Sequence, residues 1–181
     1  MKVDLSSLIS SRGTFRSLVV LLTLGITPAW AQVITVTNAA DSGAGSLRAA
    51  IDAANANTGA QTIVFDPAAF PPAAPGVIAP LSALPNLTGT GDTIDGTGAG
   101  VVLDGVNLTA LAAAGLRVRA SNYTIQGLTF NNFSANDAVI VEGRDNRPVV
   151  TDVVIASNVF NNNFRAVRVD GGNQTVNTTV D

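Results

Sequence analysis

The chain has 181 residues and a formal net charge of −3, from 10 basic and 13 acidic side chains. It contains no histidine and no cysteine, which excludes disulfide bonds, zinc sites built from those residues, and catalysis by Ser-His-Asp or Cys-His groups. The stability of the fold must therefore come from apolar packing and backbone pairing.

Residues 1–31 have a positively charged region, a short apolar run and a cleavage site with small side chains, which are the three parts of a cleavable secretory signal peptide. Their apolar run at 18–26 is shorter than the roughly 20 residues that span a bilayer, a length that disfavours the alternative of a retained membrane anchor. We expect export of residues 32–181 to a secreted, periplasmic or cell-surface location. The positive region consists of Lys2, Arg12 and Arg16, and cleavage is expected after Ala29-Trp30-Ala31, before Gln32.

Cleavage makes the chain more acidic. Residues 1–31 hold three basic residues and one acidic residue, so the basic count falls from 10 to 7, the acidic count falls from 13 to 12, and the net charge becomes −5. The remaining basic residues are arginines scattered along the sequence, which build no field for a polyanion. We therefore expect no nucleic-acid partner, and no transmembrane segment in the mature chain.

A strand, an amphipathic helix and a second strand open the mature chain. Residues 33–37 alternate apolar and polar side chains as a half-buried strand does, and residues 62–65 form the next apolar run. Between them, Ser46 or Ser42 can cap a helix that runs to about Asn57. Such a helix can cover the open end of a stack of strands. The residues expected to build this cap are Ser46, Leu47, Arg48 and Ile51.

Residues 66–92 contain six of the eight prolines. Proline cannot donate to a central strand ladder, so this segment is expected to form a loop with one edge strand near 77–81. A linker between two domains is the alternative, but a cap alone is too small to fold. We therefore expect one domain, with a cap and wrapped extension at 32–92 and repeated strands at 93–181.

The repeats lie between residues 93 and 181. Residues 125–132 recur at 155–162, a lag of 30, and residues 115–119 recur at 138–142 and again at 166–170. Periods of about 20 to 50 residues are typical of solenoids, in which each unit buries its apolar face against the next. The sequence therefore predicts a parallel coil in which Ile125 stacks on Ile155 and Phe130 on Phe160.

Asparagines follow each of these phenylalanines. Asn131 and Asn132, with their counterparts Asn161 and Asn162, could form a row that binds sugars. The other interpretation is structural, because asparagine tolerates the left-handed backbone of a tight corner and stacked asparagines form hydrogen-bonded ladders. We favour the ladder because the coil must bend where these residues occur.

One column of charges is expected on the outer face of the repeats. Arg119 and Glu142 occupy equivalent positions and can pair across rungs. Glu142 and Asp170 would place two carboxylates one rung apart, which is either a mild repulsion or part of a calcium site. Calcium needs about six oxygen ligands, and the sequence has no acidic calcium repeat to supply them. We therefore assign no metal ligand and no cofactor, with calcium as the one alternative.

The N-terminal motif carries a resemblance to a known family. Residues 45–51 (GSLRAAI), after the Asp41-Ser42-Gly43 turn and before Asn55, resemble the C-S-L-R-E-A-I box of exported bacterial right-handed parallel β-helix proteins of the pectin-lyase-like group. Gly45 and Ala49 depart from the cysteine and glutamate that are common there. The resemblance extends over most of residues 33–181 and implies an all-β, right-handed parallel β-helix with an N-terminal cap.

The resemblance specifies the architecture better than the activity, since the group includes adhesin-like surface proteins, autotransporter passengers and polysaccharide-degrading enzymes. Lyases of the group use calcium and an arginine base. Arg165 and Arg168 lie near Asp170 in the sequence, but no family motif surrounds them. Hydrolysis of the polygalacturonase type needs a histidine that this chain lacks.

We therefore assign no catalytic residue and expect a non-enzymatic exported scaffold, with adhesin-like binding to a polysaccharide or a host cell surface. The alternative is a polysaccharide lyase or carbohydrate-binding module that uses the outer face of the coil. Residues 175–180 still have the pattern of a strand. Because an uncapped rung exposes backbone groups, we expect either the amino-terminal piece of a longer, truncated product or end-to-end self-association.

Overall fold

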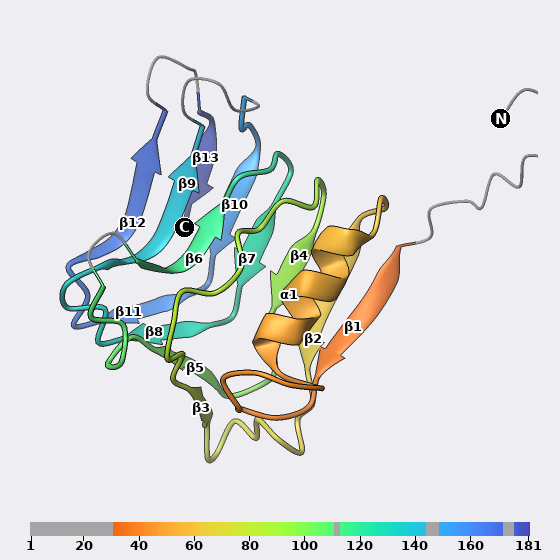
Figure 1. The fold of residues 1–181 in the computed structure, drawn as a ribbon, viewed down its shortest axis with the longest axis vertical. Coiled ribbons are helices and arrows are strands. Elements are labelled where there is room, and N and C mark those ends of the chain that lie inside the picture. The colour runs from red at the N-terminus through yellow and green to blue at the C-terminus, as the bar shows by residue number, and fades with distance from the viewer. Residues whose placement is uncertain (1–30, 111–112, 144–148, 172–175) are drawn as a thin grey trace, which may run out of the picture.

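The chain winds into a β-solenoid of parallel strands (Figure 1). The structure is a computed structural model that describes residues 31–110, 113–143, 149–171 and 176–181. The predicted signal peptide lies outside these residues except for Ala31, so it stays a prediction. The predicted all-β parallel β-helix with one capping helix is confirmed. Three sheets form the sides of the coil.

The largest sheet has six strands in the order β1-β2-β4-β7-β10-β13, all parallel, and five steps along it correspond to about five turns of the coil. Its inner column is aliphatic: Ile63, Ile94, Ile125 and Ile155 stack in register and are fully buried. Stacked strands lie about 4.8 Å apart, so these side chains touch along the axis. The strands are Gln32–Val36 (β1), Gln61–Phe65 (β2), Thr93–Asp95 (β4), Thr124–Gln126 (β7), Val153–Ala156 (β10) and Thr178–Val180 (β13).

A four-stranded sheet forms the second side, in the order β11-β8-β5-β3. Its inner column runs from Ile78 through Leu103 and Phe130 to Phe160. The rings of Phe130 and Phe160 are stacked at 5.1 Å with an interplanar angle of 10°, which confirms the predicted pair. The strands are Gly76–Ile78 (β3), Val101–Asp104 (β5), Thr129–Asn131 (β8) and Val159–Asn161 (β11).

A three-stranded sheet closes the coil, with β9 between β6 and β12. Leu116, Val139 and Val167 share one inner position, and Val118, Val141 and Val169 share the next. Every residue of β9 is buried, including those on its outer face. The strands are Ala114–Val118 (β6), Asp137–Glu142 (β9) and Arg165–Asp170 (β12).

Helix α1 (Leu47–Ala56) packs against β1 and β2 and covers the first end of the coil. The Ser46 hydroxyl caps it by accepting from the Ala49 N–H at 3.2 Å, and its apolar face is buried. The predicted cap is therefore confirmed, with Ser46 as the N-cap. Since β1 and β2 belong to the same sheet as β4, the cap continues directly into the coil.

The proline-rich segment 66–92 lies along the coil and supplies the edge strand β3, close to its predicted position. Phe70 anchors the segment, because its ring is fully buried and meets Phe65 edge to face at 5.2 Å. Further along, Leu87 forms a parallel bridge with Val118 on the closing sheet. The segment is thus bound to the same core as the strands.

Candidate functional site

The outer face of the three-stranded sheet carries most of the described arginines. Two carboxylates, Asp137 and Glu142, stand at the two ends of the central strand β9, and both residues are only 4% exposed. Arginines flank them from the strands on either side. The parallel register creates this arrangement, because residues one turn apart in the coil are neighbours on the sheet. The arginines are Arg117 and Arg119 at β6, and Arg165 and Arg168 on β12.

Glu142 is held by both arginines of the preceding rung. Arg119 Nε donates to Glu142 Oε2 at 2.7 Å, and Arg117 NH1 lies 3.4 Å from the same oxygen. The predicted Arg119–Glu142 pair is thus confirmed. It differs from the exposed pair that we expected, because Glu142 is buried, and a buried carboxylate depends strongly on its partner. Asp170 is in register with Glu142, as predicted.

Asp137 is held by the arginines of the following rung. Arg165 Nε donates to Asp137 Oδ1, and Arg168 Nε donates to Asp137 Oδ2 at 2.8 Å. Arg168 also reaches Asp170, with 2.8 Å between NH1 and Oδ2. The hydrogen bond that Arg165 donates to Asp137 raises the pKa of Arg165 above its ordinary value, so the guanidinium is held more firmly in its charged form.

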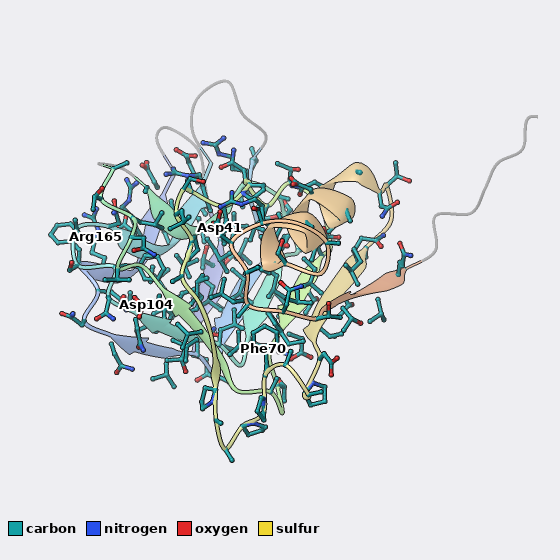
Figure 2. All side chains as sticks on the ribbon, turned by 60° about the horizontal axis from the view of Figure 1, so that its bottom comes forward. Asp41, Phe70, Asp104 and Arg165 are labelled. Atoms are coloured by element: carbon teal, nitrogen blue, oxygen red, sulfur yellow. The ribbon has the colours of Figure 1, made fainter. Side chains whose placement is uncertain are left out.

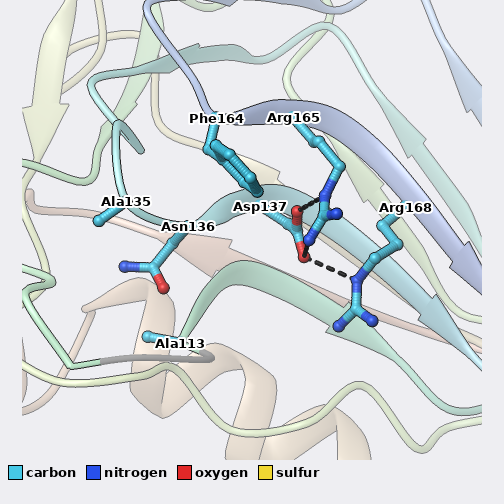
Figure 3. A pocket seen from close by; sticks show the side chains of 7 residues that line it. All are labelled: Ala113, Ala135, Asn136, Asp137, Phe164, Arg165 and Arg168. Carbon is cyan, nitrogen blue, oxygen red and sulfur yellow. Dashed lines mark hydrogen bonds and ion pairs between the residues drawn. The ribbon is translucent and has the colours of Figure 1, made fainter.

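Beside this ion-pair cluster lies a hollow of about 320 Å³, lined in part by Asn136, Asp137, Phe164, Arg165 and Arg168 (Figure 3). Phe164 is 62% exposed, and the Arg165 guanidinium carbon lies 4.7 Å from the centre of its ring. Asn136 is buried and donates through Nδ2 to the Leu108 carbonyl at 2.7 Å. Its Oδ1 atom has no hydrogen-bond partner among the described residues. An exposed aromatic ring, two cations and a polar wall are features of ligand sites.

The asparagine columns are ladders, as the structural interpretation predicted. Asn161 Nδ2 donates to Asn131 Oδ1 at 3.1 Å, and Asn162 Nδ2 donates to Asn132 Oδ1 at 2.9 Å. Asn132 and Asn162 have φ angles of 58° and 54°, the left-handed geometry that asparagine tolerates. Asn132 Nδ2 donates in turn to the Asp104 carboxylate, which starts the ladder. These amides therefore bind one another across the corners of the coil.

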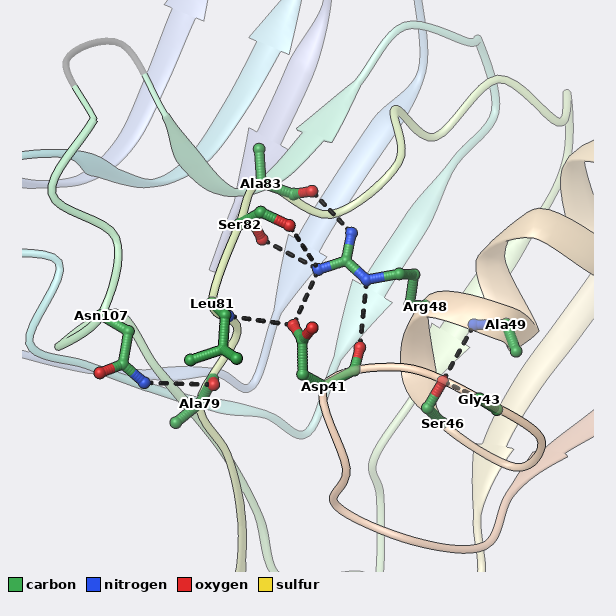
Figure 4. A network of polar contacts seen from close by, with 10 residues as sticks. All are labelled: Asp41, Gly43, Ser46, Arg48, Ala49, Ala79, Leu81, Ser82, Ala83 and Asn107. Atoms are coloured by element: carbon green, nitrogen blue, oxygen red, sulfur yellow. Dashed lines mark hydrogen bonds and ion pairs between the residues drawn. The ribbon is translucent and has the colours of Figure 1, made fainter.

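The cap contains a second polar network, centred on Arg48 (Figure 4). Its guanidinium donates to the carbonyls of Asp41, Ser82 and Ala83 and pairs with the Asp41 carboxylate at 2.9 Å. Asp41 Oδ1 also accepts from the Leu81 N–H at 3.0 Å. The Arg48 hydrogen bond, followed by the Leu81 N–H, lowers the pKa of Asp41. Arg48 thus joins the start of the helix to the proline-rich segment.

Sequence reasoning found one half of the outer-face cluster and missed the other. Asp137, Asn136 and Phe164 had no assigned role. The lag of 28 from Val139 to Val167 is also the lag from Asp137 to Arg165, and this shared spacing is the signal that could have revealed the second ion pair. The arginines are also less scattered in space than in sequence, since four of those described lie on one sheet.

Comparisons with known proteins add no family to this description: no protein-family model matches the chain, and no curated protein matches it significantly. Within the described ranges, no helix is long and apolar enough to cross a membrane. Among the same residues, no group of three or more acidic, histidine or cysteine side chains is placed to hold a metal ion.

Proposed function

We propose that this protein is a non-enzymatic scaffold, an exported β-solenoid with an adhesin-like role at a cell surface or in the medium. The observation that carries the proposal is that each of the five described arginines contacts a carboxylate. Four of these arginines reach across rungs of the coil. Such pairs join neighbouring layers, which is the role of a structural group.

The same contacts argue against the lyase alternative. An arginine that removes a proton from a uronate must first be neutral, and ion pairing with a carboxylate favours the charged form. The raised pKa of Arg165 has this cause. Arg168 shares the same carboxylate through a 2.8 Å contact. Arg165, one of the two arginines considered as bases, is thus held in the protonated state.

An activity assay tests the non-enzymatic part of the proposal. The purified chain is incubated with polygalacturonate, with and without calcium, and unsaturated products are measured by their absorbance. We expect no turnover above the rate of the Arg165→Gln variant, and no calcium-dependent rise in melting temperature. Saturable turnover by the wild-type chain that the variant lacks would overturn the proposal.

Export is tested separately. We expect N-terminal sequencing of the protein recovered outside the cytoplasm to begin at Gln32, because Ala29 and Ala31 supply the small side chains that the peptidase requires. A recovered protein that begins at Met1 would contradict the proposed signal peptide.

A carbohydrate-binding role is the second candidate, and the hollow beside Phe164 favours it. The charged side chains that line it carry a net charge of +1, from Arg165 and Arg168 against Asp137. Guanidinium groups match carboxylates in geometry and charge, and an exposed ring offers an apolar face to a sugar. An acidic polysaccharide is therefore the ligand class that fits best.

Calorimetric titration with oligogalacturonate tests this second role. We expect Phe164→Ala to weaken binding about tenfold or more, and Val106→Ala to leave it unchanged. Val106 is a matched control because it is also 62% exposed and lies outside the residues that line the hollow. Equal binding by both variants, or no binding by the wild-type chain, would exclude this site.

A further inference from the structure

The two ends of the coil differ in how much of the core they expose. Helix α1 covers the first end, where Leu47 and Ile51 are almost fully buried. At the other end, the inner positions of the last rung are partly open. Val118 and Val141 are fully buried, but Val169, next in the same column, is 46% exposed. Phe160 and Val180 are likewise more exposed than Phe130 and Ile155, one rung earlier.

Strand β12 forms one edge of this open end (Figure 1). Among the described strands it pairs only with β9. The carbonyl of Asp170 accepts from Gly143 N on the β9 side at 2.9 Å. Backbone groups alternate direction along a strand, so the N–H and C=O of Val169 face the open edge. Such an edge is a template for another strand.

The opposite edge of this sheet, at β6, is occupied by the bridge between Leu87 and Val118, so β12 of a second copy is the matching edge. An antiparallel match of β12 with itself also satisfies the charges. When Val169 is placed opposite Val169 of the second copy, Arg168 lies opposite Asp170, and Asp170 lies opposite Arg168. The arginine and aspartate already share the outer face, where they are 2.8 Å apart within one chain. Opposite charges at facing positions stabilise paired strands.

We infer that two copies of the chain join end to end through antiparallel pairing of their β12 edges, with a twofold axis at Val169. Both copies contribute the same residues to the interface, which is therefore isologous. On the inner face, the two Val169 side chains extend the column of Val118 and Val141 and lose their exposure to water. On the outer face, two reciprocal Arg168–Asp170 pairs fix the register.

Cysteine cross-linking tests the register directly. Directly opposed residues of an antiparallel hydrogen-bonded pair have Cα atoms about 5.5 Å apart, within the roughly 4.4–6.8 Å that a disulfide spans. The chain has no cysteine of its own. We therefore expect Val169→Cys to form a covalent dimer under mild oxidation. Val33→Cys is the control, because Val33 is 65% exposed on the edge strand β1 at the opposite end.

A charge change provides the second test. In the proposed register, residue 170 of each copy faces Arg168 of the other. Asp170→Lys therefore creates two cation–cation pairs, and we expect the dissociation constant of the dimer to rise about tenfold or more. Asp52→Lys makes the same charge change at an exposed position of α1 and should leave it unaltered. Analytical ultracentrifugation measures the association, and circular dichroism verifies the fold. Equal cross-linking at residues 33 and 169, a wild-type chain that stays monomeric, or an unchanged Asp170→Lys dimer would overturn the inference.

Discussion

Gly45 is the residue in the cap with the least room for a side chain. Its φ of +77° lies in the left-handed region, and an added Cβ would come within 2.2 Å of Thr37 Oγ1 and 2.7 Å of Asn38 Nδ2. The carbonyl of Gly45 accepts from the N–H groups of Thr37 and Asn38. The turn before α1 is therefore built around this glycine.

Replacing Gly45 by alanine should destabilise the protein by about 3 kcal/mol, because backbone strain and a steric clash act together. Gly98→Ala is a matched control, since Gly98 has a φ of +76° but nothing within 4 Å of the added Cβ. It should lose only the backbone contribution of about 1–2 kcal/mol. Chemical denaturation measures both changes, and equal losses would show that the clash near Thr37 is relieved.

Asp92 is a buried carboxyl group in the turn before β4. Its Oδ1 atom accepts from the Gln61 N–H at 2.7 Å, whereas Oδ2 has no hydrogen-bond partner among the described residues. Burial, only partly offset by the Gln61 hydrogen bond, raises its pKa above 3.8. The folded protein therefore retains this proton at pH values at which the unfolded chain has released it.

The pKa shift of Asp92 predicts a pH-dependent loss of stability. Because the folded-state pKa is raised, stability falls as pH rises from the ordinary value of 3.8 through the raised pKa. Asp92→Asn removes the charge and keeps the acceptor for Gln61, so it should melt at a higher temperature than the wild type at neutral pH. Its advantage should shrink toward pH 4. Melting curves across this range test the prediction, and a less stable variant at neutral pH would contradict it.

The corners of the coil show which residue preferences can be recognised in the sequence. Left-handed residues recur with a lag of 30: Asn122 and Asp152, Gly127 and Ser157, and Asn132 and Asn162. The last pair was predictable because asparagine tolerates this geometry. Ser157 was not, since serine has no such preference, and its conformation follows from the rung on which it stacks.

At the scale of elements, α1 depends on Arg48 for its attachment. The side chain reaches two backbone carbonyls of the proline-rich segment, Ser82 O at 3.0 Å and Ala83 O at 2.7 Å, while it remains paired with Asp41. A planar group with several N–H donors can make all these contacts at once. The helix and the segment are therefore held as one unit.

Arg48→Lys keeps the charge but cannot reproduce this set of hydrogen bonds. We expect a loss of about 2 kcal/mol in the free energy of unfolding, together with faster proteolysis within residues 66–92. Arg165→Lys is the control, because Arg165 lies on β12, far from the helix, and pairs with Asp137, so the proteolysis of residues 66–92 should not change. Identical digestion patterns for the two variants would show that Arg48 does not hold the segment.

The three sheets were predictable to different degrees. In the first two, hydrophobic columns repeat with a lag of 30, and Ile125–Ile155 and Phe130–Phe160 follow from that spacing. The outer-face cluster was harder to predict, because an ion pair depends on which side of a strand each residue faces. Asp137 lies two residues before the inner Val139, so alternation along β9 would place it inside the coil. The lag of 28 aligns Asp137 with Arg165, but its second partner, Arg168, emerged only from the structure.

Across the whole molecule, α1 and the last rung lie at opposite ends, with Arg165 far from the helix (Figure 2). In the inner column of the four-stranded sheet, the side chain of the last rung is more exposed than those before it. Phe130 is fully buried between Leu103 and Phe160, whereas Phe160 has a described neighbour on one side only and is partly exposed. In a solenoid each rung is stabilised mainly by its neighbours. The last rung should therefore be the least stable part of the coil.

Truncating each phenylalanine tests this gradient within a single column. Phe130→Ala should cost about 3–5 kcal/mol, as for other fully buried aromatic residues, and Phe160→Ala about 1–2 kcal/mol because part of its ring already faces water. Denaturation gives both values. Hydrogen exchange should show the lowest protection in β11 and β12, and uniform protection along the coil would contradict a gradient.

Because the columns repeat with a lag of 30, one turn of the coil is a sequence unit that can be duplicated as a block. Residues 123–152 begin just before β7 and end just before β10, and the strands at both junctions occupy the same place in their sheet. A tandem duplication of this block would lengthen the coil by one turn and leave every aliphatic, aromatic and asparagine column in phase. Insertion of a single residue within a strand would instead move the side chains that follow it to the opposite face of the sheet. Such a chain can therefore evolve in length by whole turns.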